Sequence, residues 1–178
     1  MNNNMSNKID IRESLPEDRK ALDAIYSAAF TDEDLTPLLR ELLNEKDSVF
    51  SFVAIRDGVL VGHVIFTMCS IAGCSEKVGL LGPVAVSPHI QKQGIGSSLI
   101  QEGLNQLKSE GVIQIYVLGD PNYYGRFGFK PDGNVKPPYE LPQEWQTAWQ
   151  SINLHGVKSN LNGTLYVPKP WRKQTLWA

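Results

Sequence analysis

The sequence predicts a single domain of mixed α/β class. Its length of 178 residues suits one domain with one core. Short apolar segments with strand-like alternation are interleaved with longer segments in which apolar residues recur at helical spacing. We find no internal repeat and no linker long enough to divide the chain, so one continuous core is expected over residues 8–178.

The composition argues against several classes of protein. Hydrophobic residues make up 42% of the chain and charged residues 20%, which is ordinary for a soluble globular protein. The net charge of -2 does not indicate a nucleic-acid partner, because proteins with such partners usually carry a basic patch. No apolar run has the length of a transmembrane helix, so no membrane partner is expected. Cys69 and Cys74 lack the spacing of a zinc site, so we expect free thiols, no metal and a cytoplasmic protein.

The N-terminal region should contain one strand and two helices. Residues 1–7 are polar and lack the pattern of a signal peptide, so we expect a disordered tail there. Alternating isoleucines predict a short strand over Lys8–Arg12. Ser14 and Glu17 have the spacing of a capping box, which predicts that a helix begins between them. A second helix is expected to start at Thr36-Pro37.

Three strands are predicted next. Ser51–Arg56 and Val59–Ile71 are both apolar and contain β-branched residues, and Asp57-Gly58 between them is a strong hairpin signal. Gly73 marks the following turn. The segment Lys77–Val86 is apolar over most of its length, which is typical of a strand at the centre of a sheet.

The most regular helical pattern follows the third of these strands. Apolar residues recur every three or four positions over Gly94–Ser109, and Gly111 is placed to end the helix. A strand is then expected over Gln114–Leu118, a short helical turn over Asn122–Arg126 and an extended segment over Phe127–Lys130.

Residues 132–178 form a C-terminal extension of the same domain, in which prolines weaken the pattern. We expect a helix around Glu144–Ile152 and a final strand over Thr164–Val167. The extension is rich in large aromatic residues, which should pack over the sheet, line a ligand pocket or form a subunit interface. These aromatic residues are Tyr139, Trp145, Trp149, Trp171 and Trp177.

A glycine-rich loop between the central strand and the long helix carries the clearest functional signal. The pattern Gln91-x-x-Gly94-x-Gly96 ends where the helix starts. Glycine lets a ligand approach the backbone, and the first turn of a helix presents unpaired N–H groups and the positive end of the helix dipole. The pattern therefore predicts an anion site that fits a pyrophosphate. Neither a Walker loop nor a dinucleotide fingerprint matches, because Gly-Lys-Ser/Thr is absent and residue 99 is a leucine.

This loop, placed after an apolar strand, resembles the acetyl-CoA signature of the GNAT N-acetyltransferases. The resemblance implies a central, mostly antiparallel, twisted sheet with helices on both faces and a central strand that splays from its neighbour to admit CoA. It also implies that the backbone of Val84, Ala85 and Val86 pairs with the pantetheine amides. The loop and helix start would hold the CoA pyrophosphate through Gln91, Lys92, Gln93, Gly94, Ile95, Gly96 and Ser97.

A second motif stands at the distance that this family requires. The segment Tyr124–Phe129, with the sequence YGRFGF, resembles the Tyr-x-x-x-Gly-Phe that ends the GNAT catalytic core. The stretch from Leu118 onward resembles a bacterial subgroup of N-acetyltransferases of the YhbS type, and the whole resemblance covers about residues 8–131. The chain departs from the family at Asp120 and Pro121, so the side-chain contacts that other members make to CoA there are not carried over.

The resemblance implies a transferase that moves an acetyl group from acetyl-CoA, its co-substrate, to a primary amine by direct attack. Tyr124 would protonate the CoA thiolate, and Tyr123 is the neighbouring competitor for this role. A phenol with an ordinary pKa of about 10 can serve a thiol with a pKa of about 8.5. The general base is left open among Glu76, His63, Glu33 and a relaying water.

Two other functions are compatible with the sequence. One is a non-catalytic acyl-CoA-binding sensor or interaction module, which would bind acetyl-CoA without acceptor-dependent release of thiol. The other is a nucleotide-binding α/β domain, which would bind NAD or ATP.

The acceptor stays open between a small-molecule amine and an amine of a peptide or protein. The acidic run Thr31–Asp34 would favour a cationic acceptor, or simply caps a helix start. Arg126 is either a phosphate contact or a surface charge. The family resemblance also raises the expectation of a homodimer.

Overall fold

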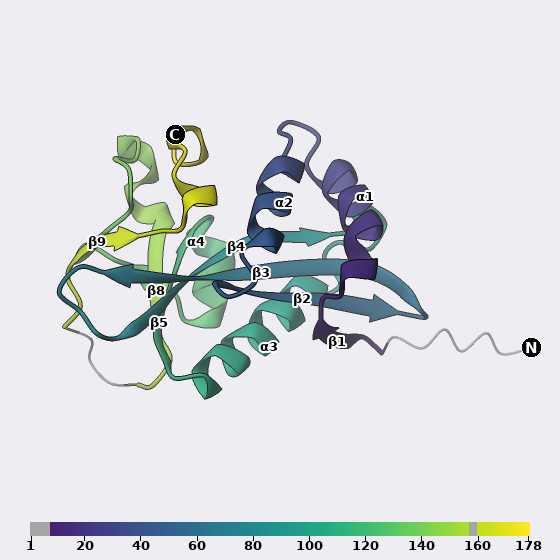
Figure 1. Cartoon of the computed structure of the whole chain (residues 1–178), viewed down its shortest axis with the longest axis horizontal. Helices are drawn as coiled ribbons and strands as arrows, with labels where there is room; N and C mark the ends of the chain where they lie inside the picture. Colours follow the sequence, from purple (N-terminus) through teal and green to yellow (C-terminus); the bar gives the residue numbers. More distant parts are fainter. Residues whose placement is uncertain (1–7, 157–159) are drawn as a thin grey trace, which may run out of the picture.

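A long twisted sheet runs through the molecule, with helices on both of its faces (Figure 1). The computed structural model describes residues 8–156 and 160–178, so the expected tail over residues 1–7 lies outside the described residues. The main strand order is β1-β2-β3-β4-β5-β8-β6, and β4–β5 is the parallel pair along this path. The other neighbours on it pair antiparallel. The mixed α/β class and the mostly antiparallel sheet are therefore confirmed.

The elements have the following bounds. The strands are β1 Asp10–Glu13, β2 Val49–Arg56, β3 Val59–Ile71, β4 Lys77–Val86, β5 Val112–Leu118, β6 Lys130–Pro131, β7 Val135–Lys136, β8 Trp149–Asn153 and β9 Gly163–Tyr166. The α-helices are α1 Arg19–Ala29, α2 Thr36–Asn44, α3 Ile95–Ser109 and α4 Pro121–Tyr124. Short 3-10 helices cover Pro16–Asp18, Pro88–Ile90, Gly125–Phe127, Gln143–Ala148, Lys169–Trp171 and Gln174–Leu176. Strands β3 and β4 have the predicted bounds.

The β2–β3 hairpin turns at the predicted dipeptide. Asp57 and Gly58 have φ angles of 50° and 76°, the left-handed conformations of a two-residue turn that matches the twist of the strands. Gly111, with φ of 82°, follows the end of α3 in the left-handed conformation expected of a helix-ending glycine. The left-handed backbone conformation, which glycine adopts readily, thus allows both the hairpin turn and the end of α3.

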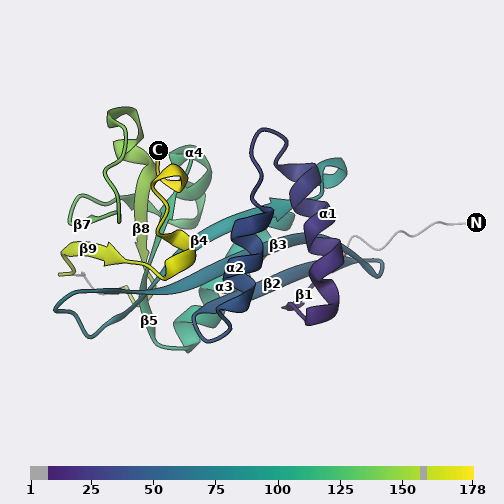
Figure 2. The same cartoon turned by 45° about the horizontal axis from the view of Figure 1, so that its top comes forward.

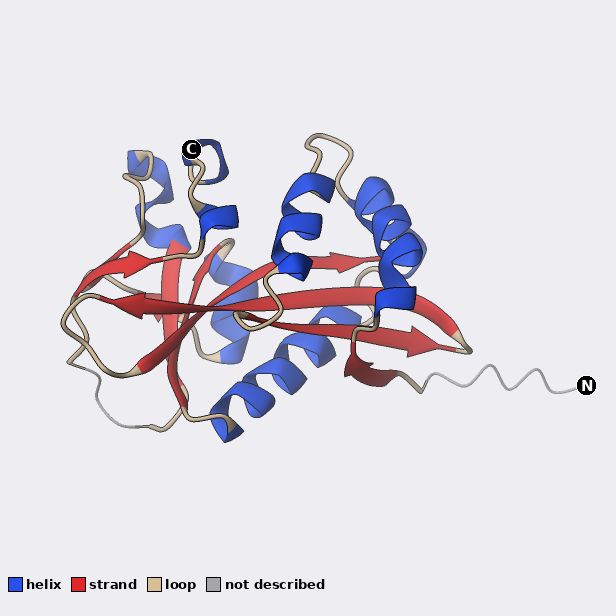
Figure 3. Cartoon of the chain, in the orientation of Figure 1, coloured by secondary structure: helices blue, strands red, loops and turns tan. Residues whose placement is uncertain are grey.

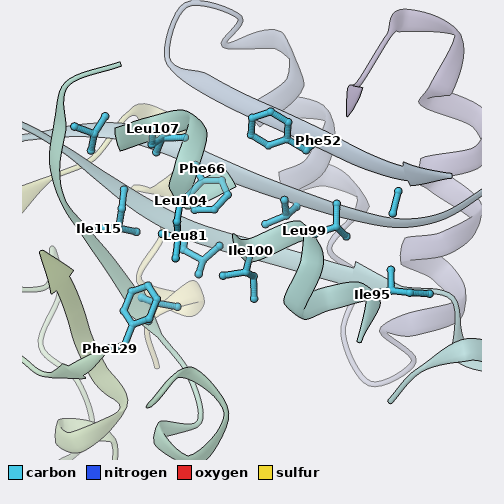
Figure 4. Close-up of a cluster of buried hydrophobic side chains, with 14 of the residues drawn as sticks. Phe52, Phe66, Leu81, Ile95, Leu99, Ile100, Leu104, Leu107, Ile115 and Phe129 are labelled. Atoms are coloured by element: carbon cyan, nitrogen blue, oxygen red, sulfur yellow. The ribbon is translucent and has the colours of Figure 1, made fainter. Parts of the chain in front are cut away.

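Strand alternation sends the side chains of the central sheet to its two faces, and Figure 3 shows helices on both sides of the strands. On β3, Val64 and Phe66 face the layer under α3, whereas Ile65 faces the layer under α1 and α2. Figure 4 shows Phe66 and Leu104 among the side chains between α3 and the sheet. Each face of the sheet is therefore covered by its own helices.

The start of the first helix differs from the prediction. The backbone N–H of Leu15 donates to Asp18 Oδ2 at 2.7 Å, so the capping acceptor is Asp18 and not Glu17. Ser14 instead donates its hydroxyl to Ser51 on β2. The reason lies in β1, because Arg12 forms an ion pair with Asp18 at 2.7 Å and holds its carboxylate at the helix start.

The expected helix over Glu144–Ile152 is wrong in its second half. A 3-10 helix ends at Ala148, and Trp149 then begins β8, which pairs antiparallel with β5. The Trp149 ring stacks on Tyr116 of β5 with centroids 5.5 Å apart, so burial of this face against β5 outweighs the helical pattern. The segment expected to be extended over Phe127–Lys130 is shorter than predicted, because a 3-10 turn includes Phe127.

The C-terminal extension lies on the same side of the sheet as α2 (Figure 2). Trp149 and Trp177 are each 2% exposed and join a second core cluster, whereas Trp145 is 38% exposed. The indole N–H of Trp171 donates to Thr67 Oγ1 on β3 at 3.0 Å. Part of the aromatic set therefore forms core, and part of it stays accessible.

Replacement of Gly103 should destabilise the fold. A Cβ at this position of α3 would overlap the ring of Phe66, which is fully buried among other core side chains. We expect Gly103→Ala to lower the free energy of unfolding by about 1–3 kcal/mol in urea titrations. Gly133→Ala is the matched control, because a Cβ there meets nothing within 4 Å. Equal stability of the two variants would contradict this packing argument.

Candidate functional site

The central strands separate halfway along their length. The parallel pairing of β4 with β5 begins at Lys77 and ends where Leu80 faces Tyr116. Strand β4 continues to Val86 and stays paired with β3 on its other side. Within the described part of the chain, no strand pairs with β4 on the β5 side beyond Leu80. The predicted splayed central strand is therefore present, and it leaves backbone groups open in the sheet.

The register with β3 shows which backbone groups face this opening. Ser87 N–H donates to Val61 C=O at 2.9 Å, so Ser87 points toward β3. Because alternate residues of an antiparallel pair point the same way, Val86 and Val84 direct their N–H and C=O groups into the opening and Ala85 does not. The Val86 carbonyl accepts a hydrogen bond from the Gln91 side-chain amide at 3.1 Å, which agrees with this assignment.

A groove of about 470 Å³ begins at this opening. It is lined by β4, the loop before α3, the first turn of α3, and the segment after β5. The lining residues are Val84, Val86, Gln91, Lys92, Gly94, Ile95, Gly96, Ser97, Tyr123, Tyr124 and Arg126.

Two residues expected in the site lie outside this groove. Ala85 is buried on the α1 face of the sheet, and Gln93 accepts a hydrogen bond from Arg56 at 3.1 Å.

The wall formed by α3 suits an anion. Gly94 is the N-cap with φ of 83°, and no side chain caps the first turn, so its N–H groups are available to a ligand. A Cβ at Gly96 would lie 2.9 Å from the Tyr123 hydroxyl and 3.6 Å from Val86 Cγ2, so a larger residue would fill this part of the groove. Lys92 and Arg126 supply the positive side chains of the lining.

The two adjacent tyrosines occupy different parts of the groove. The Tyr123 hydroxyl reaches the start of α3 at Gly96, and the Arg126 guanidinium lies 4.7 Å from the centre of its ring. The Tyr124 ring lies against Gly119, where any Cβ would overlap it, and packs edge-on to Phe129. Burial, and next the neighbouring Tyr123, raise the pKa of Tyr124 above its ordinary value. Tyr124 therefore keeps its proton at neutral pH.

A second hollow, also of about 470 Å³, lies on the opposite face of the sheet. Its walls come from the α1–α2 loop, α2, the middle of β4, the end of β5 and the C-terminal extension. It adjoins the groove at the splay, because Pro83 lines the hollow while the next residue, Val84, lines the groove. Gly119 lines the hollow, and the Tyr124 ring, which lines the groove, packs against Gly119. A pocket is one of the three roles that the sequence predicts for the extension. The sequence does not single it out, because segments far apart in the chain build this hollow.

A model of the acetyltransferase (GNAT) family matches residues 19–129, which is more than half of the chain and contains both motifs. The chain is a GNAT acetyltransferase. It is 31% identical over 153 residues to the protein described as the uncharacterized N-acetyltransferase YjhQ of Escherichia coli (strain K12), with 82% of this chain and 84% of YjhQ covered. The family membership makes it an acetyl-CoA-dependent acyltransferase.

Two solved structures of GNAT proteins resemble this acetyltransferase over nearly their whole length. YhbS from Escherichia coli, in complex with CoA, has a TM-score of 0.80 and 26% identity, with 93% of each chain covered. A GNAT acetyltransferase from Brucella melitensis, in complex with acetyl-CoA, has a TM-score of 0.75 and 29% identity, with 92% of this chain and 97% of that chain covered. At this coverage, most of the C-terminal extension belongs to the portion that these structures share with the chain.

The three candidate bases of the acetyltransferase lie in different places. Glu76 is exposed before the start of β4, about 26 Å along the strand from Val84 at roughly 3.3 Å per residue. His63 is completely buried, with Nδ1 2.7 Å from the Tyr26 hydroxyl and Nε2 2.7 Å from Ser51 Oγ. Glu33 lines the second hollow. Of the three, only Glu33 is beside a cavity that adjoins the splay.

Two other features of the site concern metals and membranes. In the residues that the structure describes, no group of three or more His, Cys, Asp or Glu side chains is placed to hold a metal ion. No helix in the described ranges 8–156 and 160–178 has the length and apolar character needed to cross a membrane.

Buried His63 should make stability depend on pH. Burial lowers the pKa of His63 from 6.5 to about 3, so below pH 6.5 the unfolded chain binds a proton that the folded chain does not. The free energy of unfolding should therefore fall as the pH is lowered from 6.5 to 4, by at most about 1.4 kcal/mol per pH unit. Urea titrations at several pH values measure this slope.

The control for this prediction is His63→Gln, which keeps hydrogen-bonding groups but does not titrate. We expect this variant to lose most of the slope between pH 6.5 and 4. Asp18, whose pKa is lowered by its hydrogen bond from Arg12, contributes a separate loss of stability below its ordinary value of 3.8. An unchanged slope in His63→Gln would show that other groups cause the pH dependence.

Proposed function

We propose that this acetyltransferase transfers the acetyl group of acetyl-CoA to a primary amine in a ternary complex, with Tyr124 as the proton donor to the leaving thiolate. The observation that carries the proposal is the junction of two cavities at the splay of β4 and β5. One cavity has an anion-binding wall and open backbone, and the other can hold a second substrate. A transfer reaction needs both substrates to meet at one point.

The groove fits CoA in two ways. The N–H groups at the start of α3, with Lys92 and Arg126, suit the pyrophosphate. The backbone groups of Val84 and Val86 that face the opening suit the pantetheine amides, which would extend the sheet like an added strand. The complexes of YhbS with CoA and of the Brucella melitensis protein with acetyl-CoA support this use of the groove.

The chemical step then follows from the groups at the junction. The lone pair of a neutral amine attacks the thioester carbonyl carbon, and the tetrahedral centre breaks its C–S bond, which leaves the electron pair on sulfur. A backbone N–H in the open part of β4 supports the oxyanion. Tyr124 donates to the sulfur, and the surplus proton of the amine passes to water.

The raised pKa of Tyr124 makes it a weaker acid, but burial keeps the difference in pKa between the phenol and the CoA thiol small. The same poorly solvated surroundings that raise the pKa of the phenol also raise the basicity of a thiolate held beside it. The sulfur therefore remains a suitable acceptor for the proton. Tyr123 lies at the α3 end of the groove, where its hydroxyl is near Gly96, and we assign it to the wall of the anion site.

Acetyl-CoA should stabilise the folded chain. At 100 times its dissociation constant it adds about 2.7 kcal/mol to the free energy of unfolding, which thermal unfolding detects as a raised Tm. NAD and ATP serve as controls and should leave the Tm unchanged. A shift with NAD or ATP alone, or no shift with millimolar acetyl-CoA, would refute the assignment of the groove.

Removal of the Tyr124 hydroxyl should slow the chemical step. We expect Tyr124→Phe to lower kcat about 100-fold or more in an assay of thiol release, with the Kd for acetyl-CoA unchanged, because a positioned acid contributes roughly that factor. Tyr116→Phe is the matched control, since its hydroxyl is buried outside the groove without a hydrogen-bond partner among the described residues. A greater loss of kcat in Tyr123→Phe than in Tyr124→Phe would move the acid to Tyr123.

A further inference from the structure

The hollow on the α2 face combines apolar walls with charge of a single sign. Its charged lining side chains are Glu33 and Asp120, and no lysine, arginine or histidine is among the described residues that line it. Most of the remaining surface comes from aromatic, leucine and proline side chains. A ligand of this hollow therefore meets one or two negative charges and a large apolar surface.

The two carboxylates differ in how far they are already engaged. Asp120 Oδ1 accepts the N–H of Asn122 at 2.9 Å and caps α4. Beside Glu33, Asp34 accepts both the N–H and the hydroxyl of Thr36. Across the residues that the structure describes, neither a hydrogen bond nor an ion pair engages the carboxylate of Glu33. Glu33 is thus the carboxylate of the hollow that is most available to a cation.

Part of the apolar wall is held by contacts within the protein. Trp171 is tied to β3 through its hydrogen bond with Thr67, and Lys173 forms an ion pair with Glu41 of α2 at 2.8 Å. Trp145 stands at the hollow with 38% of its surface exposed, although large aromatic side chains are usually more buried. An apolar ligand group packed on this indole would remove exposed aromatic surface from water.

We propose that the acceptor is a small monoamine, with one ammonium group and an aromatic or branched apolar body. This inference rests on the proposed function, because it assigns the hollow to the acceptor. The ammonium lies near Glu33, and the apolar body packs against Trp145 and Trp171. A molecule with several ammonium groups fits poorly, because its further charges would lose water against apolar walls without a partner. After loss of its proton to water, the amine reaches the thioester at the splay past Pro83.

The test compares matched acceptors with the full chain and saturating acetyl-CoA. 2-Phenylethylamine carries one ammonium and an aromatic body, whereas spermidine carries several ammonium groups and no apolar body. Thiol release should give a kcat/KM at least 10-fold higher for 2-phenylethylamine. A preference for spermidine, or for a lysine-containing peptide, overturns the inference and leaves acetyl transfer itself standing.

Variants of the hollow connect this preference to named residues. Trp145→Ala should raise the KM for 2-phenylethylamine about 10-fold, and Trp145→Phe should restore most of the loss. Glu33→Gln should also raise the KM, whereas Asp32→Asn is the matched control, since Asp32 does not line the hollow. Unchanged KM values in both Trp145→Ala and Glu33→Gln overturn the inference.

A binding measurement separates failure of this inference from failure of the proposed function. Calorimetry of 2-phenylethylamine with the protein saturated with CoA needs no turnover. Binding that weakens about 10-fold in Trp145→Ala supports the acceptor class even if no thiol is released. No binding, in a protein that acetyl-CoA still stabilises, overturns the acceptor class alone. Failure of the proposed function would instead appear as no stabilisation by acetyl-CoA.

Discussion

The separation of β4 from β5 beyond Leu80 is the constraint on which the rest of the structure depends. A strand in the middle of a sheet normally has partners on both sides, and unpaired backbone groups buried without water are unfavourable. Here, within the described residues, one edge of β4 lacks a partner strand inside the sheet, and this edge lines a groove. The helices on the two faces, together with the C-terminal extension, keep the rest of the sheet covered around this gap.

The two faces give the gap two chemically different sides. On one face, the first turn of α3 and its glycines provide N–H groups and positive charge. On the other, α2 and the extension provide leucine and tryptophan surfaces, Pro83 and Pro121 add apolar surface, and Glu33 and Asp120 add carboxylates. The segment after β5 belongs to both sides, because Gly119 lines one cavity and supports the Tyr124 ring in the other. Sheet geometry thus places a groove with an anion-binding wall beside a hollow with apolar walls.

Sequence reasoning succeeded where structure is decided locally. The strands β3 and β4, the helix α3 and their turns follow from alternation, helical spacing and glycine position, and all the predicted residues of the loop and helix start except Gln93 line one groove. It failed where distant segments compete. Asp18 replaces Glu17 as the cap because of Arg12, and Trp149 enters a strand because of Tyr116. The position of Ala85 on the buried α1 face follows from the register with β3, and the second hollow requires the path of the whole chain.

The hydrogen bond from Gln91 to the Val86 carbonyl has a consequence for how tightly any ligand can hold this edge. The Gln91 amide takes one of the two lone pairs of that oxygen, so the other can still accept a second donor. An amide that displaces Gln91 replaces one hydrogen bond by another and gains little from it. An amide that shares the oxygen instead leaves the loop before α3 tied to the strand edge.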